Sequence, residues 1–251
     1  MLSEGLSLHY QPIVSAVSGR LVAAEALLRR HDEKAAPLKL LKSAAALGDS
    51  ERLDRSVIEH ACEQLGTWGA AGLHLPVHVN VSTETAVSTD AARFTAWLSR
   101  LAVSHSAVTI EVTETTRIRA LGALVEFVDT CRTAGFEIAI DDFGCGYSTL
   151  ALLQRFRADV VKIDRRFVAA LPEDRWTRAI VRHLIALAHD LGMRVIGEGV
   201  ETAEQTAWLR RLDCDELQGY AIARPMSGEE LLRWAGRRID PAAASRLASG
   251  L

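Results

Sequence analysis

Short apolar runs along the chain alternate with longer segments of helical period. Eight runs are typical of strands: LSLHYQPIV, LVAAEALL, LPVHVNVS, VTIEVTE, FEIAIDD, DVVKID, RVIGEGV and ELQGYAI. From the third run onward the connecting segments carry apolar residues at helical spacing, as in 91–101, 121–134, 176–191 and 203–212. Alternating strands and helices favour a parallel sheet, and eight strands within 251 residues predict an α/β fold closed into a (β/α)8 TIM-like barrel.

The first connection departs from this pattern. Only SAVSGR (15–20) separates the first two runs, which is too short for a parallel crossover. We therefore expect an antiparallel first strand. The longer segment 39–68 predicts two helices, and a last helix is expected to end soon after Trp234, followed by a frayed tail.

Composition narrows the class of protein. Apolar residues make up 49% of the chain, enough for a sizeable core, and the net charge of −3 argues against a nucleic acid polymer as partner. Four scattered cysteines without a Cys-x-x-Cys pair indicate free thiols in a reducing compartment. The sequence has no apolar span of membrane length and its N-terminus does not read as a signal peptide, so a cytoplasmic location is expected.

Polar residues interrupt the strands near their C-terminal ends. Strands of a parallel barrel are buried on both faces and should be almost wholly apolar. The barrel mouth at these ends is where active sites of this architecture lie. The residues concerned are Glu25, Asn80, Glu111, Asp141, Asp142, Lys162, Glu198 and Gln218.

Charge balance at this mouth predicts metal ions. Taken singly, each residue is more often a helix cap or an ion-pair partner, but their coincidence across seven strands favours a shared function. Five carboxylates carry a formal −5, which two divalent cations and Lys162 would neutralise. An all-oxygen donor set fits Mg²⁺ or Mn²⁺, with Asp141 bridging the two ions and Asp142 holding the second.

Two neighbouring residues take supporting interpretations. Lys162 is predicted to orient or deprotonate a metal-bound water, and Asp164, two residues on, could fix the lysine. His78 shares parity with Asn80, so it is expected to point into the barrel one layer deeper. We interpret it as a hydrogen-bonded core histidine, with a role in the site as the alternative.

Two motifs are misleading. Asp142-Phe143-Gly144 copies the metal-binding tripeptide of kinases, but neither a His-Arg-Asp loop nor a glycine-rich nucleotide loop accompanies it. Gly144-Cys145-Gly146 resembles a phosphate-cradling turn, which is weak evidence by itself.

In combination, the motifs resemble the EAL domain family of bacterial cyclic di-GMP phosphodiesterases. The signature Glu25-Ala26-Leu27 stands among motifs in family order and spacing over residues 7–227: YQPIV, EALLR, NVS, EVTE, DDFGCGYSTL, VKIDRRFV, GEGVET and LQGYAIARPM. The resemblance implies a single domain over 1–251 with its core at about 7–236. It also implies hydrolysis of cyclic di-GMP to linear 5′-pGpG, a homodimer, and sensor or cyclase domains outside this chain.

Residue roles follow from the same resemblance. Glu25, Asn80, Glu111 and Asp141 would hold one metal, and Asp141 and Asp142 the second, with Glu198 acting on it directly or through water. Lys162 and Gln218 would contact the catalytic water, so catalysis is assigned to Glu25, Lys162, Glu198 and Gln218. Arg29 would bind a substrate phosphate, Gln11 would line the nucleotide site, and Asp164 is counted with them as a substrate-binding residue. Glu114 would anchor the loop that couples the metal site to the dimer interface, with Phe143, Gly144 and Gly146.

Departures from the family pattern leave two alternatives open. Arg30 replaces a usual tryptophan, alanine near Ala45 replaces a common glutamate, and Gly197 replaces a usual alanine. None of these removes a metal ligand or the lysine. The alternatives are a catalytically silent receptor for cyclic di-GMP or a partner protein, and a two-metal barrel that acts on another phosphodiester.

Overall fold

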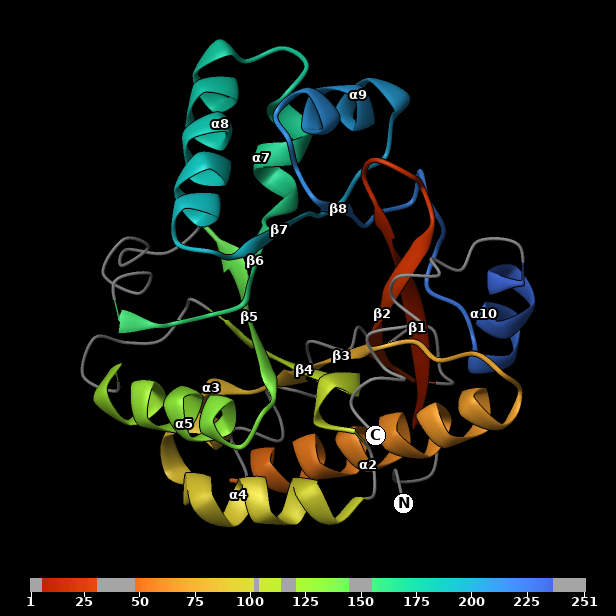
Figure 1. Cartoon of the computed structure of the whole chain (residues 1–251), viewed down its shortest axis with the longest axis vertical. Helices are drawn as coiled ribbons and strands as arrows, with labels where there is room; N and C mark the ends of the chain where they lie inside the picture. The colour runs from red at the N-terminus through yellow and green to blue at the C-terminus, as the bar shows by residue number, and fades with distance from the viewer. Residues whose placement is uncertain (1–5, 31–47, 102–103, 114–120, 145–154, 237–251) are drawn as a thin grey trace.

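The computed structural model describes residues 6–30, 48–101, 104–113, 121–144 and 155–236, which form a closed eight-stranded barrel surrounded by helices (Figure 1). The strands follow one another around the barrel in chain order. They are β1 (Leu6–Ser15), β2 (Leu21–Arg30), β3 (Val77–Val81), β4 (Val108–Thr113), β5 (Glu137–Phe143), β6 (Val160–Ile163), β7 (Arg194–Gly197) and β8 (Glu216–Leu217). The predicted TIM-like fold is confirmed.

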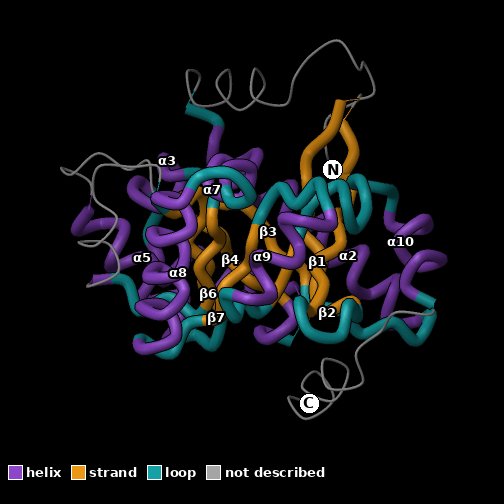
Figure 2. The backbone as a smooth tube through the Cα atoms, turned by 90° about the horizontal axis from the view of Figure 1, so that it is seen from above, coloured by secondary structure: helices purple, strands orange, loops and turns teal. Residues whose placement is uncertain are grey.

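The first strand runs against its neighbours, as the short first connection predicted. β1 pairs antiparallel with both β2 and β8, whereas all pairs from β2 to β8 are parallel. β2 pairs with β3 only over Ala24–Ala26, so the ends of the β1–β2 hairpin extend beyond the other strands (Figure 2). This extension carries Arg29, whose partner across the hairpin is Ser7.

Helices cover the outside of the barrel. In Figure 1, α7, α8 and α9 lie beside β6 to β8, α2, α4 and α5 beside β3 to β5, and α10 beside β1. Their bounds are α2 (Ser50–Ala70), α3 (Thr83–Ser88), α4 (Ala91–Leu98), α5 (Leu121–Thr133), α7 (Arg165–Ala170), α8 (Arg175–Asp190), α9 (Ala203–Arg211) and α10 (Gly228–Ala235). Two 3₁₀ turns, η1 (Ser99–Leu101) and η2 (His105–Ala107), complete the set. The first part of the predicted helical region 39–68 lies outside the described residues.

The periodic pattern did not predict α3 and α7. Each has six residues, too few to show a period, and each begins directly after a strand. Their N-caps are Ser82 and Asp164, whose side chains accept hydrogen bonds from the backbone N–H groups of Thr85 and Arg166.

The last two strands are shorter than predicted. β7 ends at Gly197 instead of Val200, and β8 ends at Leu217 instead of Ile222. The segments that follow these two strands approach so closely that a Cβ at Gly219 would collide with the backbone of Val200. Backbone hydrogen bonds still join them, because the Val200 N–H donates to the Gln218 carbonyl. The strand prediction was wrong because an apolar run cannot reveal such an irregular crossing.

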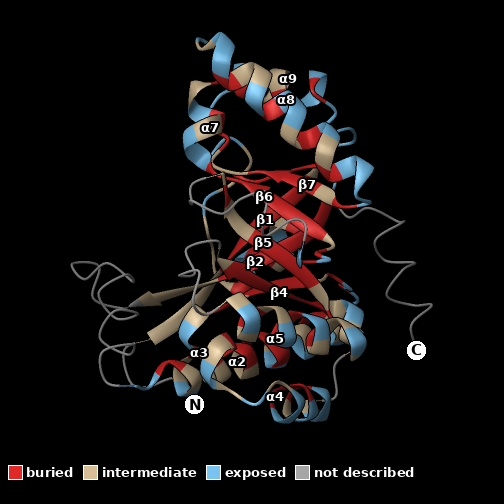
Figure 3. Ribbon diagram, turned by 90° about the vertical axis from the view of Figure 1, so that its left-hand side faces the viewer, coloured by how far each residue is buried: buried red, intermediate tan, exposed pale blue. Residues whose placement is uncertain are grey.

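The barrel separates two apolar cores. The larger lies between the strands and the helices, and Figure 3 shows the strands as a buried layer between two groups of helices. The smaller contains Ile13, Val22, Ala23, Ala139, Val160 and Ile196. Five of these share strand parity with the polar residues of the mouth, so this small cluster fills the barrel interior below them.

No helix within the described part of the chain is both long and apolar enough to cross a membrane.

Candidate functional site

The polar residues singled out in the sequence converge at the C-terminal mouth of the barrel. Successive side chains of a strand point to opposite faces, so one parity on each strand faces the interior. In the upper interior layer that parity selects Gln11, Glu25, Asn80, Glu111, Asp141, Lys162, Glu198 and Gln218. Apart from Glu198 and Gln218, which come directly after β7 and β8, all of them lie within strands.

Lys162 is at the centre of this layer. It is fully buried, and its Nζ lies 2.8 Å from Glu198, 2.9 Å from Glu111, 3.2 Å from Glu25 and 3.4 Å from Asp141. Burial alone would lower the pKa of Lys162, but the four carboxylates outweigh it and raise this pKa well above its usual value. Lys162 is therefore an ammonium in this arrangement.

Amide groups complete the surroundings of Glu25. The Gln218 Nε2 donates to its Oε2 at 2.7 Å and the Asn80 Nδ2 to its Oε1 at 3.0 Å. Burial would raise the pKa of Glu25, yet Lys162 and these two hydrogen bonds lower it overall. Gln218 also reaches Gln11, at 3.3 Å between Nε2 and Oε1, so Gln11 borders the same layer.

A β-bulge brings the two adjacent aspartates to the same site. Between Ile140 and Phe143 the register of β5 against β6 shifts, so that Asp141 and Asp142 together lie opposite the single residue Lys162. Asp142 takes the left-handed conformation with φ of 54°, which aspartate tolerates better than most residues. Because of the bulge, both carboxylates face the mouth, although neighbours in a regular strand point to opposite faces.

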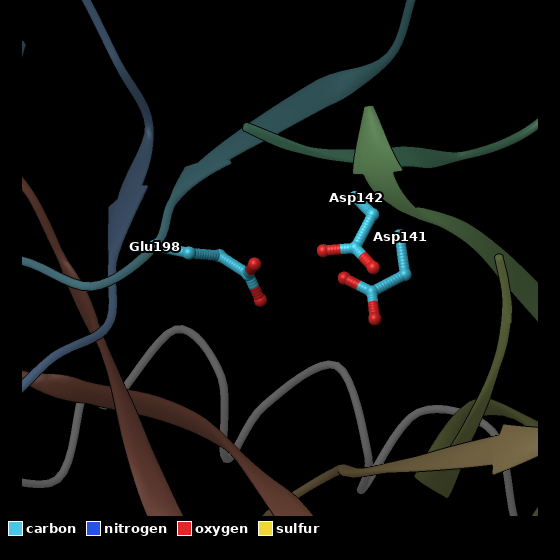
Figure 4. Close-up of side chains that lie close together, drawn as sticks. All are labelled: Asp141, Asp142 and Glu198. Carbon is cyan, nitrogen blue, oxygen red and sulfur yellow. The ribbon is translucent and has the colours of Figure 1, made fainter. Parts of the chain in front are cut away.

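Three of these carboxylates could hold a cation. Asp141, Asp142 and Glu198 each offer one oxygen, and these oxygens lie within 4.8 Å of one another. Figure 4 shows Glu198 pointing across the mouth toward the two aspartates of β5. Within the described part of the chain, Gln218 Oε1 is buried without a hydrogen bond, and so is Asp141 Oδ1, although the latter lies 3.4 Å from Lys162 Nζ. Buried oxygens that lack hydrogen-bond donors fit a hard cation with its water shell, so the donor set fits Mg²⁺ or Mn²⁺.

Burial disfavours the charged form of three carboxyl groups of the site, those of Glu111, Glu198 and Asp142. Burial raises the pKa of Glu111 and of Glu198 well above the usual value, against the opposing effect of Lys162. Burial, with the charge of Asp141 next, raises the pKa of Asp142 to about 6. Asp164, the cap of α7, contributes to this rise through its side chain. The Lys162 ammonium therefore does not offset the burial of these carboxyl groups and their mutual repulsion.

Other predicted residues lie at the edge of the site. Asp164 accepts hydrogen bonds from the backbone N and the Nε of Arg166, at 2.7 and 2.9 Å, and its suggested role in fixing Lys162 stays a prediction. Arg29 is half-buried on the hairpin extension, four residues beyond Glu25, and its Nη1 donates to the Leu28 carbonyl. Glu114 and Gly146 lie outside the described residues.

Phe143, the last residue of β5, and Gly144, which follows it, have clear structural roles. Phe143 is buried in the outer core. Gly144 has a φ of 97°, and a Cβ there would come within 2.6 Å of the ring of Phe167. Gly144 is therefore a position that only glycine fills without strain.

His78 lies directly beneath the site. The sequence favoured a hydrogen-bonded core histidine, and the structure places the ring in the interior with Nδ1 at 2.8 Å from Glu111 Oε1. Burial, followed by the charge of Lys162, lowers the pKa of His78 to about 4. The parity of His78 was the available signal, but it could not identify Glu111 as the partner.

Comparison with known protein families identifies the domain, since the EAL domain model matches residues 1–225. The chain belongs to the EAL domain family. Among its relatives, it is 37% identical over 234 residues to MucR, the bifunctional diguanylate cyclase/cyclic di-GMP phosphodiesterase of Pseudomonas aeruginosa, a match over 90% of this chain and 34% of MucR. It is 35% identical over 240 residues to the cyclic di-GMP phosphodiesterase NbdA of the same organism, over 92% of this chain and 30% of NbdA. The chain thus spans about a third of the length of these two relatives.

Solved structures of EAL proteins have the same fold. The complex of the PaMucR phosphodiesterase with c-di-GMP superposes with a TM-score of 0.82 at 36% identity, covering 90% of this chain and 94% of that one. Klebsiella pneumoniae BlrP1 in its manganese/cy-diGMP complex superposes with a TM-score of 0.80 at 28% identity, covering 91% of this chain and 58% of the BlrP1 chain.

Proposed function

We propose that this EAL domain hydrolyses cyclic di-GMP to linear 5′-pGpG with the help of two divalent cations, Mg²⁺ or Mn²⁺. The observation that carries the proposal is the polar layer at the barrel mouth, which brings together Glu25, Asn80, Glu111, Asp141, Lys162, Glu198 and Gln218, with Asp142 beside Asp141. The family of the chain and the phosphodiesterase names of its relatives support the same reaction.

The proposed ligands divide between two sites. Glu25, Asn80, Glu111 and Asp141 would hold one cation, and Asp141, Asp142 and Glu198 the other, with Glu198 acting directly or through water. The three oxygens gathered from Asp141, Asp142 and Glu198 support the second set. When bound, such ions supply Lewis-acid polarisation of the phosphate and lower the pKa of a water molecule.

The side chains of this domain would position the reactants. A water oxygen forms a new bond to phosphorus while the bond from phosphorus to a 3′-oxygen breaks, which leaves a 5′-phosphate and a 3′-hydroxyl. Lys162 lies among the proposed ligands, and we assign this residue to orienting or deprotonating the attacking water. Gln218 would hydrogen-bond the same water, Gln11 would line the nucleotide site, and Arg29 would bind a phosphate.

A nucleotide assay tests this proposal. The purified chain is incubated with cyclic di-GMP and Mn²⁺, and the nucleotides are separated. We expect linear 5′-pGpG from the wild type, and none from Glu25→Gln or Lys162→Met. Glu84→Gln removes an exposed carboxylate of α3 outside the site and should leave turnover unchanged.

Other outcomes would point to other functions. Bound but unchanged cyclic di-GMP would contradict the proposal in favour of a receptor. Neither binding nor turnover would favour another phosphodiester as substrate.

We also infer a homodimer, and sensor or cyclase domains beside this one, from the family. The small share of MucR and NbdA that the chain covers agrees with additional domains in such proteins. Light scattering of the purified chain tests the dimer, since the proposal requires twice the mass of 27.4 kDa. A cytoplasmic location stays a prediction.

A further inference from the structure

Beneath the metal-ligand layer lies a buried polar side chain to which the proposed reaction gives no role. His78, in β3, is 2% exposed and belongs to the lower interior layer of the barrel. The other interior residues at this depth are mostly the apolar residues of the smaller core. A buried polar ring in such surroundings is costly unless it makes a specific hydrogen bond.

The hydrogen bond that His78 makes goes to a predicted metal ligand. Its Nδ1 lies 2.8 Å from Oε1 of Glu111, which is itself fully buried. A cation ligand must be an ionised carboxylate, which only accepts hydrogen bonds, so in that state Nδ1 carries the hydrogen and the ring is the donor. The two residues come from neighbouring strands, since Asn80 pairs with Glu111 and His78 stands two residues before Asn80.

A hydrogen-bond donor can fix the orientation of the Glu111 carboxylate, which apolar packing cannot. The last torsion of a glutamate is broad, so apolar neighbours leave the plane of its carboxylate poorly fixed. At Glu111 one oxygen is held by His78 from below, while Lys162 approaches the carboxylate at 2.9 Å from a different strand. Two donors in different directions fix the orientation of the carboxylate.

We propose that His78 is a positioning residue, whose Nδ1–H fixes the Glu111 carboxylate in the orientation required of a cation ligand. The inference rests on the proposed function, because it assumes that Glu111 is a ligand. Removal of an outer hydrogen bond of this kind typically costs about 10- to 100-fold in metal affinity. If His78 only filled the interior, its loss would change stability without a specific effect on metal affinity.

Titration calorimetry of the full chain with MnCl₂ separates these roles. His78→Leu keeps much of the volume and removes the donor, and should weaken Mn²⁺ binding about 10- to 100-fold. His78→Asn keeps an amide N–H near the position of Nδ1 and should retain most of the affinity. Thr109→Val is the matched control, because Thr109 is a buried polar residue of the Glu111 strand that bonds Glu137 at the opposite end. It should leave the affinity unchanged.

The outcomes distinguish this inference from the proposed function. A wild type that binds Mn²⁺ and hydrolyses cyclic di-GMP, together with a folded His78→Leu of equal affinity, would overturn the role of His78 alone. Equal losses of Mn²⁺ affinity in His78→Leu and His78→Asn would also overturn it, because the amide N–H of asparagine would then make no difference. A wild type that binds no Mn²⁺ would overturn both.

A second measurement covers the case in which His78→Leu does not fold. Nitrogen-15 NMR of the wild-type histidine rings reports which nitrogen carries the proton. We expect the neutral tautomer of His78 with hydrogen on Nδ1. The tautomer with hydrogen on Nε2 alone would overturn the inference, because Nδ1 could not then donate to Glu111.

Discussion

Lys162 shows how one residue can stabilise an acidic site. Its buried ammonium lies within ion-pair distance of four carboxylates, and the nearest oxygen, of Glu198, is at 2.8 Å. Without this charge the carboxylates would repel one another in a poorly solvated layer. We therefore assign Lys162 a structural role in the metal-free protein as well as a role in the proposed reaction.

Lys162→Met should destabilise the metal-free protein. Removing one partner of a buried ion pair costs about 3–5 kcal/mol, because the remaining charge has no compensation. Urea unfolding at pH 8 in EDTA should report a lower free energy of unfolding, and Mn²⁺ should restore more stability to the variant than to the wild type. Arg132→Met removes a partly exposed ion pair with Asp159, away from the site, and should change stability by about 0–1 kcal/mol. Equal stability of Lys162→Met and wild type in EDTA would contradict this role.

Asp142 predicts how cation binding depends on pH. Its pKa is raised to about 6, so it is a carboxylate at pH 7.5 and takes up a proton as the pH falls through 6. Protons then compete with the cation, and the affinity for Mn²⁺ should fall about tenfold per pH unit below 6 for each proton displaced. Calorimetry between pH 7.5 and 5 measures this dependence, which should be shallower in Asp142→Asn. A constant affinity over this range would rule out Asp142 as a ligand that titrates near 6.

At the scale of elements, the bulge in β5 is the feature on which the site depends most. The sequence predicted two adjacent carboxylates at the end of a buried strand, but a regular strand would have turned one of them away. The register shift against β6 and the left-handed φ of Asp142 resolve this conflict. Neither can be predicted from hydrophobic pattern, because a bulge adds one residue without changing the composition of the run.

Gly144 fixes the path of the chain just after the bulge. Gly144→Ala should lower the free energy of unfolding by about 2 kcal/mol, since its φ of 97° disfavours a side chain and the new Cβ would meet Phe167. The double variant Gly144→Ala with Phe167→Leu should lose less free energy of unfolding than the sum of the two single variants, because the smaller leucine relieves the clash with the new Cβ. Chemical denaturation measures both.

The control for this experiment is a helical glycine. Gly66→Ala, in α2 with no atom near the added Cβ, should stabilise the protein by about 0.5–1 kcal/mol. A neutral effect of Gly144→Ala would contradict the left-handed backbone and the close approach of Phe167 at this position.

For the whole molecule, the sequence predicted the barrel and the residues of its mouth but not their mutual contacts. The alternating runs and the short connection 15–20 predicted eight strands with an antiparallel first strand, and the structure has them. Strand parity was sufficient to bring Glu25, Lys162 and Gln218 together in one layer. The contact of His78 with Glu111 depends on the stagger between strands, which no local pattern specifies.

The central claim is that a pair of divalent cations neutralises the acidic mouth of this barrel. Diffraction from crystals soaked in MnCl₂, with data collected at the manganese absorption edge, tests it most directly. We predict two anomalous peaks at the mouth, both within bonding distance of the Asp141 carboxylate, with Asp142 beside one and Glu111 beside the other. A mouth without manganese, in which Lys162 keeps its four carboxylate partners at full metal concentration, would contradict the account.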